Sequence, residues 1–216
     1  DFCLSRGLGD VYKRQNDMFQ EYVVDAALVA LMHNGEVCDM KTFQCPKVHK
    51  SFEERLTDLI AKIGENMNLR RAAMLEVSNG VIASYVHNAC KPNLGKIGVL
   101  VALESNGDKA KLQELGKHIA MHVAASNPQF LTIADVDQAS IDHEKAIFSE
   151  QAKASGKPEN IIEKMVEGRI KKYFDEVVLE EQAYIMDPDK KVKQVIADAA
   201  KDMGTDIKLK EYVCFR

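Results

Sequence analysis

The chain has 216 residues, of which 46% are hydrophobic and 29% charged, and this composition is typical of a globular protein. Its longest apolar stretches, Ala26–Met32 and Ile97–Leu103, are far shorter than the roughly 20 residues that cross a bilayer, so the sequence predicts neither a membrane span nor a membrane partner. The 29 Lys and Arg against 33 Asp and Glu give a net charge of −4, which argues against direct nucleic-acid binding.

Residues 1–15 carry neither a helical stripe nor a sustained strand alternation. They begin without Met and show no charged, apolar and small-residue succession typical of a signal peptide. We expect a non-native or disordered segment, and the alternative is a genuine flexible arm.

Residues 16–64 have the pattern of two amphipathic helices. Apolar side chains recur at helical spacing from Phe19 to Ala30, and Asn34-Gly35 is expected to end the first helix. The second helix is predicted to begin at Ser51, which forms a capping box with Glu54, and to end at Gly64. The stretch between the helices, residues 36–50, is expected to be a polar loop.

Three strand-like stretches follow these helices: Leu69–Ser78, Val81–His87 and Ile97–Leu103. Asn79-Gly80 between the first two is a strong signal for a hairpin turn. Helices followed by an antiparallel meander indicate an α+β fold rather than a βαβ arrangement.

The second half of the chain is predicted to be mostly helical. A helix is expected over Lys109–Ser126, closed by Pro128. Two amphipathic helices joined by Ser155-Gly156-Lys157 predict an antiparallel helical hairpin over about residues 137–175. A short strand, a helix and a final strand follow at Ala183–Met186, Lys191–Met203 and Ile207–Phe215, the last with Ile207, Leu209, Val213 and Phe215 on one face.

These elements predict two subdomains, each an antiparallel sheet with helices. The first spans residues 16–104 and the second residues 105–216, and the helical hairpin projects from the second.

Residue types that carry chemistry do not form a catalytic pattern. The chain has neither of the glycine-rich phosphate-binding motifs. His118 and His122 lie on one side of a predicted helix, where a zinc site, a half-buried structural pair and a partner-facing pair are the alternatives. The spacing of His33, Cys38, Cys45 and His49 matches no common zinc motif. The sequence therefore predicts no catalytic residue, no metal and no cofactor.

The five cysteines are odd in number and scattered, without a C-x-x-C pair. Such cysteines favour a reducing, cytoplasmic compartment in which the thiols are free. They are Cys3, Cys38, Cys45, Cys90 and Cys214.

Four stretches, in order along the chain, closely resemble the signature of the bacterial translation elongation factor Ts family. They are Ala61–Arg71 (AKIGENMNLRR), Lys96–Ala102 (KIGVLVA), Lys117–Pro128 (KHIAMHVAASNP) and Ser155–Arg169 with its SGKP and IEKMVEGR. The resemblance covers about residues 16–216.

This resemblance implies a guanine-nucleotide exchange factor rather than an enzyme. The family binds elongation factor Tu in its GDP-loaded form, perturbs the magnesium and phosphate site and releases GDP. It also implies two α+β subdomains with a projecting helical hairpin, and the second subdomain is expected to approach a distal domain of the partner or a second copy of the chain, as a homodimer.

The resemblance also implies partner-binding residues. Ile97 and Gly98 begin the strand that lies near the nucleotide-binding domain of the partner, and His118 and His122 lie on a helix that contributes to that contact. Of the two histidines, His122 is preferred as the contact residue.

The sequence departs from the family pattern near its start. Asp10–Arg14 occupies the place where the family has a Thr-Asp-Phe-Val segment that helps to dislodge magnesium. The family's small N-terminal helical module and its last helical module are also missing from the 216 residues. We therefore expect a truncated core with impaired exchange. The alternative is a non-catalytic dimerisation or scaffold module that binds a partner without exchange.

Overall fold

The computed structural model describes residues 16–45, 49–153 and 159–216. The predictions for residues 1–15 and for the connection at residues 155–157 lie outside these ranges.

Helices α2 (Asp17–Met32) and α4 (Phe52–Ile63) pack together through the predicted apolar stripes. The capping box at the start of α4 is confirmed, since Glu54 N donates to Ser51 Oγ at 3.1 Å and Ser51 N donates to Glu54 Oε2 at 2.7 Å. At the start of α2, Asn16 Oδ1 accepts hydrogen bonds from two backbone amides of the helix. Both helices therefore have a capped N-terminus.

The prediction of a polar loop over residues 36–50 is wrong. The stretch contains helix α3 (Val37–Thr42) and the short paired strands β1 (Gln44–Cys45) and β2 (Lys50–Ser51). Met40 is only 1% exposed and inserts into the helical core. Burial of this apolar side chain stabilises regular structure in a stretch whose polar composition predicts a loop.

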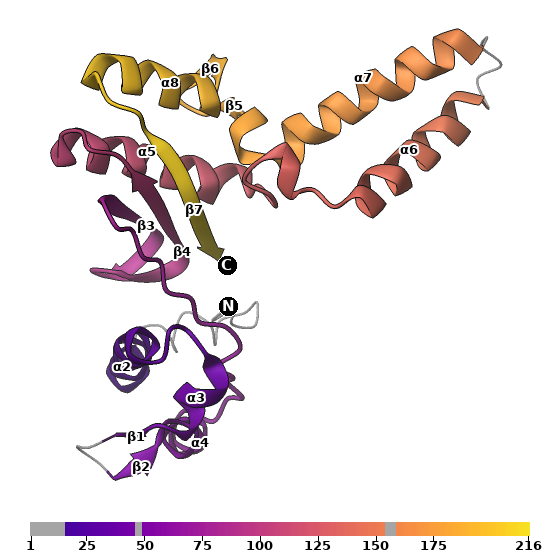
Figure 1. Cartoon of the computed structure of the whole chain (residues 1–216). Coiled ribbons are helices and arrows are strands. Elements are labelled where there is room, and N and C mark those ends of the chain that lie inside the picture. Colours follow the sequence, from indigo (N-terminus) through magenta and orange to yellow (C-terminus); the bar gives the residue numbers. More distant parts are fainter. Residues whose placement is uncertain (1–15, 46–48, 154–158) are drawn as a thin grey trace.

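The main sheet has three antiparallel strands in the order β3–β4–β7. They are β3 (Gly80–Lys91), β4 (Leu94–Glu104) and β7 (Lys208–Phe215). The prediction of a strand over Leu69–Ser78 is wrong, because residues 68–78 pair with none of the described strands. The chain runs through this stretch from the helices to the sheet (Figure 1).

The predicted hairpin turn at Asn79-Gly80 is not formed, because residues 68–78 before it are not a strand. β3 and β4 are joined at Pro92-Asn93, where Asn93 has a φ of +64° and Lys91 lies opposite Leu94. Gly80 instead begins β3, and a Cβ there would lie 1.9 Å from Leu103 O. The glycine of the Asn-Gly signal thus permits close approach of two strands rather than a turn between them.

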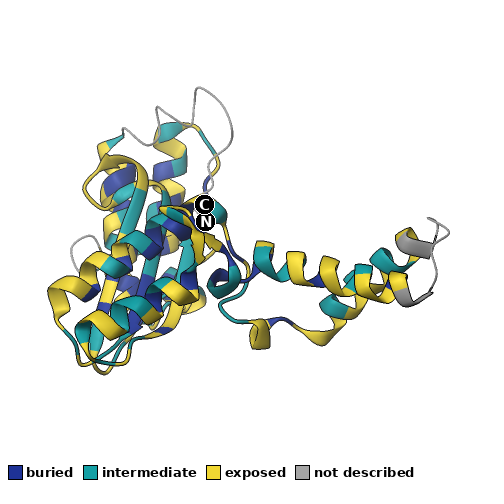
Figure 2. Cartoon of the chain, turned by 90° about the horizontal axis from the view of Figure 1, so that it is seen from above, coloured by how far each residue is buried: buried dark blue, intermediate teal, exposed yellow. Residues whose placement is uncertain are grey.

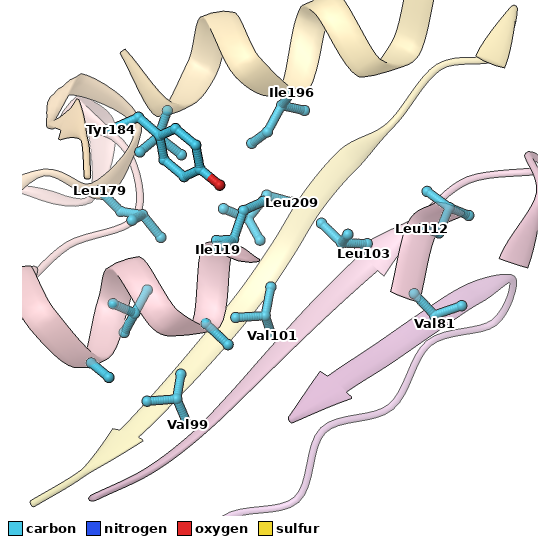
Figure 3. Packing of buried hydrophobic residues seen from close by; sticks show 14 residues of the cluster. Val81, Val99, Val101, Leu103, Leu112, Ile119, Leu179, Tyr184, Ile196 and Leu209 are labelled. Atoms are coloured by element: carbon cyan, nitrogen blue, oxygen red, sulfur yellow. The ribbon is translucent and has the colours of Figure 1, made fainter. Parts of the chain in front are cut away.

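One face of the sheet is covered by α5 (Lys109–Ser126) and α8 (Val192–Met203), as Figures 1 and 3 show. The core there is formed by residues such as Val101, Leu103, Leu112 and Ile119, all fully buried. The strands β5 (Ala183–Tyr184) and β6 (Asp187–Lys191) form a separate pair before α8.

The predicted facing of the last strand is wrong because β7 contains a bulge. Ala102 pairs with Glu211 while its neighbour Leu103 pairs with Leu209, so one residue of β7 is left over. Leu209 packs in the core under α5, as does Tyr212, whereas Val213 lies on the opposite face.

The helical hairpin is observed as α6 (Gln138–Lys153) and α7 (Glu159–Val177), which we call the arm. It projects away from the sheet in Figure 1, and Figure 2 shows that most of its described length is exposed or half-buried. Two short 3₁₀ helices flank it, η1 (Ile133–Asp135) before α6 and η2 (Leu179–Glu181) after α7.

The α+β class is confirmed. The sheet takes β3 and β4 from the predicted first subdomain and β7 from the predicted second one. The boundary at residues 104 and 105 therefore falls between strands of one sheet, and the division into subdomains stays a prediction.

Candidate partner-binding site

Ile97 and Gly98 lie side by side in β4 but face opposite sides of the sheet. Ile97 is half-buried and packs against the core that α5 covers. Gly98 lines the other side, and apart from its own chain neighbours no heavy atom of the described residues lies within 4 Å of the place where its Cβ would be. Of the two, Gly98 leaves an open space on the molecular surface.

A groove of about 550 Å³ lies beside Gly98, between α2 and this outer face of the sheet. We call it the α2 groove. Part of its wall is formed by Leu69, Arg71, Ala72 and Ala73. Its lining is mainly apolar and includes Val23, Leu31, Ala72, Leu100, Val213 and Phe215.

Cationic side chains flank this groove. The Arg71 guanidinium lies over the Phe215 ring at 5.0 Å, in cation–π geometry. Arg216 also lines the groove, and its Nη2 donates to Ala124 O at 2.5 Å. The groove therefore combines an apolar floor with positive charge at one side, a surface suited to apolar side chains next to an acidic group.

Helix α2 adds apolar surface. Its outer side exposes Val24, Leu28, Leu31 and Met32, and Leu28 and Met32 are 57% and 65% exposed. Large apolar side chains gathered on one helix face mark an interaction surface more often than single exposed ones do.

His118 and His122 lie one turn apart on α5 but in different environments. His118 is half-buried, whereas His122 is fully buried. His122 Nε2 lies 2.9 Å from Gln182 Oε1, and its Nδ1 accepts from Ile185 N at 3.3 Å. Burial lowers the pKa of His122, and the Gln182 hydrogen bond opposes this effect. Both ring nitrogens are thus satisfied inside the chain, and the His122 ring does not reach the surface.

The structure does not bring the four predicted contact residues together on one surface. Gly98 faces the groove, Ile97 packs toward the core, and His122 lies inside it. The α2 groove was missed by the sequence reasoning. The sequence signals for this groove are Val213 and Phe215, but the simple alternation predicts them on the same face as Leu209, because the bulge in β7 is not visible in the residue pattern.

The described residues hold neither a cluster of metal ligands nor a membrane-spanning helix. Within residues 16–45, 49–153 and 159–216, no three His, Cys, Asp or Glu side chains gather closely enough to hold a metal ion. Cys38 and Cys90 are exposed and free, and Cys45 and Cys214 are free and half-buried. In the same ranges, no helix has both the length and the apolar character that a membrane crossing requires.

Comparison with known proteins decides the family. The model of the family "Elongation factor TS" matches residues 14–216. The chain belongs to the elongation factor Ts family. The resemblance seen in the four sequence stretches is thereby confirmed.

Several proteins named Elongation factor Ts share about half of their aligned residues with this chain. The protein of Rhodospirillum centenum is 49% identical over 213 residues, which are 99% of this chain and 69% of the relative. That of Paramagnetospirillum magneticum is 52% identical over 201 residues, 93% of this chain and 64% of the relative. That of Rhodospirillum rubrum is 51% identical over 203 residues, 94% and 66% of the two chains. The chain thus spans about two thirds of the length of these relatives.

Proposed function

We propose that this chain binds elongation factor Tu and promotes release of its GDP during translation elongation, as the elongation factor Ts family does. The observation that carries the proposal is the family match over residues 14–216. In this proposal the chain exchanges the nucleotide by binding its partner and catalyses no covalent reaction. Because the proposed activity is part of translation, we propose a cytoplasmic location for the chain.

The mechanism follows from linked binding equilibria. An exchange factor that binds the nucleotide-free partner more tightly than the GDP-loaded partner must weaken GDP binding by the same factor. The 216 residues contain no Thr-Asp-Phe-Val segment. We therefore propose that this chain accelerates release more weakly than a relative that carries the segment.

Our proposed contact surface includes Gly98 and the neighbouring groove. The open space at Gly98 and the apolar groove lining support this choice. Ile97, on the α5 side of the sheet, and His118, on α5 itself, are half-buried and are proposed as contacts separate from the groove. His122 is proposed to act indirectly, by holding α5 and the arm in place, because its ring is buried.

Calorimetric titration of nucleotide-free elongation factor Tu tests this surface. Gly98→Gln fills space that is open in the free chain, so it should leave folding intact and weaken binding by about 1–2 kcal/mol, roughly tenfold. Ala61→Gln on α4 is the control, since Ala61 is exposed and does not line the groove. Equal affinities for the Gly98 variant and the control would remove Gly98 from the contact surface.

A homodimer through the second half of the chain is a separate proposal. It rests on the family resemblance. Light scattering after size exclusion should give twice 24.1 kDa if the proposal is right and 24.1 kDa if it is not.

A further inference from the structure

Three Asn-Gly pairs occur in the chain: Asn34-Gly35, Asn79-Gly80 and Asn106-Gly107. An asparagine before glycine can react with its own main chain, because the unhindered glycine nitrogen can turn toward the side-chain carbonyl carbon and attack it. All three asparagines are exposed to solvent. The restraints on the glycine nitrogen and on the asparagine side chain therefore decide which pair reacts.

Two of the pairs are held by backbone hydrogen bonds. Gly35 N donates to Ala30 O at 2.9 Å at the end of α2. Asn79 O accepts from Ser105 N at 3.2 Å, and Gly80 lies in the ladder of β3 with β4. Either pair must open locally before its glycine nitrogen can reach the asparagine side chain, and this opening slows the reaction.

The third pair, Asn106-Gly107, lies in the loop between β4 and α5, outside every described helix and strand. Gly107 N donates to the Ser105 hydroxyl at 3.1 Å, which is a contact with a side chain and not with the main chain. Ser105 Oγ also lies 3.2 Å from Thr205 Oγ1, so the hydroxyl keeps a hydrogen bond when it releases Gly107. The nitrogen of Gly107 is therefore the least restrained of the three.

The side chain of Asn106 also has a hydrogen-bond donor at its carbonyl oxygen. Asn79 Nδ2 donates to Asn106 Oδ1. This hydrogen bond polarises the carbonyl that the Gly107 nitrogen attacks, and the same donor faces the negative charge that develops on Oδ1. A nucleophile, an electrophile and an oxyanion donor thus lie together at one exposed loop.

We propose that Asn106 is a site of spontaneous deamidation, with Asn79 as the donor that stabilises the developing oxyanion. The Gly107 nitrogen loses its proton to solvent base and forms a bond to Asn106 Cγ, and Nδ2 leaves as ammonia. Water then adds to the resulting succinimide. Opening at the main-chain carbonyl gives isoaspartate, and opening at Cγ gives aspartate. One ammonia is lost and one water is gained, with no oxidation or reduction.

The reaction changes the loop that leads into α5. Both products carry a carboxylate at residue 106, and isoaspartate also adds one methylene to the main chain. Two residues later, Asp108 Oδ1 caps α5 by accepting from Ala110 N at 2.7 Å. A longer main chain shifts Asp108 relative to the helix and weakens this cap. The inference is independent of the proposed function, because it concerns only groups inside this chain.

Peptide mapping by mass spectrometry, after incubation of the folded chain at pH 8 and 37 °C, tests the proposal. Fragmentation by electron transfer distinguishes isoaspartate from aspartate. A parallel incubation in guanidinium chloride gives the rate of each pair in the unfolded chain. In the folded chain Asn106 should react fastest, give isoaspartate as well as aspartate and keep most of its unfolded rate, whereas Asn34 and Asn79 should be slowed about tenfold or more.

A substitution of the donor tests the role of Asn79. Asn79→Ala should slow the reaction at Asn106 by about two- to tenfold in the folded chain, which is the value of one hydrogen bond, and should leave the rate in guanidinium chloride unchanged. Ser78→Ala is the control, since Ser78 is exposed and precedes Asn79 in the chain. It should keep the wild-type rate in both conditions.

Three results would overturn the proposal: a slower reaction at Asn106 than at Asn34 or Asn79 in the folded chain, aspartate at residue 106 without isoaspartate, or a wild-type rate at Asn106 in folded Asn79→Ala.

Discussion

At the scale of single residues, His118 and His122 differ because only one of them lies on the buried side of α5. The sequence shows that both lie near the apolar stripe, but a separation of four residues leaves their burial open. The partner that decides it, Gln182, lies 60 residues away in sequence. No local pattern could therefore have assigned His122 to the interior.

His122→Ala should destabilise the chain by about 2–4 kcal/mol. The substitution leaves a cavity and removes the acceptor of the Ile185 amide as well as a hydrogen bond to Gln182. His118→Ala is the control on the same helix and should cost less than about 1 kcal/mol. Urea unfolding of both variants measures the difference, and equal losses would contradict the burial of His122.

Stability should also fall with acid because of His122. Its pKa in the folded chain is lowered from the ordinary 6.5, so below pH 6.5 the unfolded chain binds more protons than the folded chain. The contribution of His122 is fully present above pH 6.5 and is lost as the pH falls toward the lowered pKa of the folded state.

Unfolding free energies at several pH values between 7.5 and 5 check this sign. The wild-type chain should lose stability with acid more steeply than His122→Gln, which has no ring to protonate. Parallel pH profiles for the two proteins would contradict the prediction.

At the scale of elements, the helices were largely predictable and the strands less so. Amphipathic spacing and caps are local signals, and α2, α4, α5 and α8 begin and end within about two residues of their predicted places. Strand pairing is not local. Leu69–Ser78 has the composition of a strand, but none of the described strands pairs with it.

Gly116 tests the packing of α5 on the sheet. A Cβ there would lie 2.6 Å from Ala83 Cβ on β3, so Gly116→Ala should destabilise the chain by about 1–3 kcal/mol despite the better helix propensity of alanine.

Gly168→Ala on α7 is the matched control, because a Cβ at this helical position meets open space. It should stabilise the chain by up to about 1 kcal/mol. Thermal unfolding of both variants gives the two signs, and a stabilising Gly116→Ala would show that α5 does not approach β3 this closely.

At the scale of the whole molecule, the α2 groove exists because β7 returns from the far end of the chain to pair with β4. Val213 and Phe215 thereby come to face α2, nearly 200 residues earlier in sequence. The resemblance of four short stretches could predict the family, since it depends on residue identities in order. It could not predict this surface, which depends on the bulge in β7.

We propose that the chain promotes release of GDP from elongation factor Tu. Stopped-flow release of a fluorescent GDP analogue, with increasing concentrations of the 216-residue chain, tests it most directly. The release rate should rise with concentration and reach a plateau above the spontaneous rate, lower than that given by the Rhodospirillum centenum relative, and Gly98→Gln should shift the half-maximal concentration roughly tenfold upward. A release rate that stays at its spontaneous value at saturating chain would contradict the claim, and if calorimetry still detects binding, the chain would instead be a scaffold that binds without exchange.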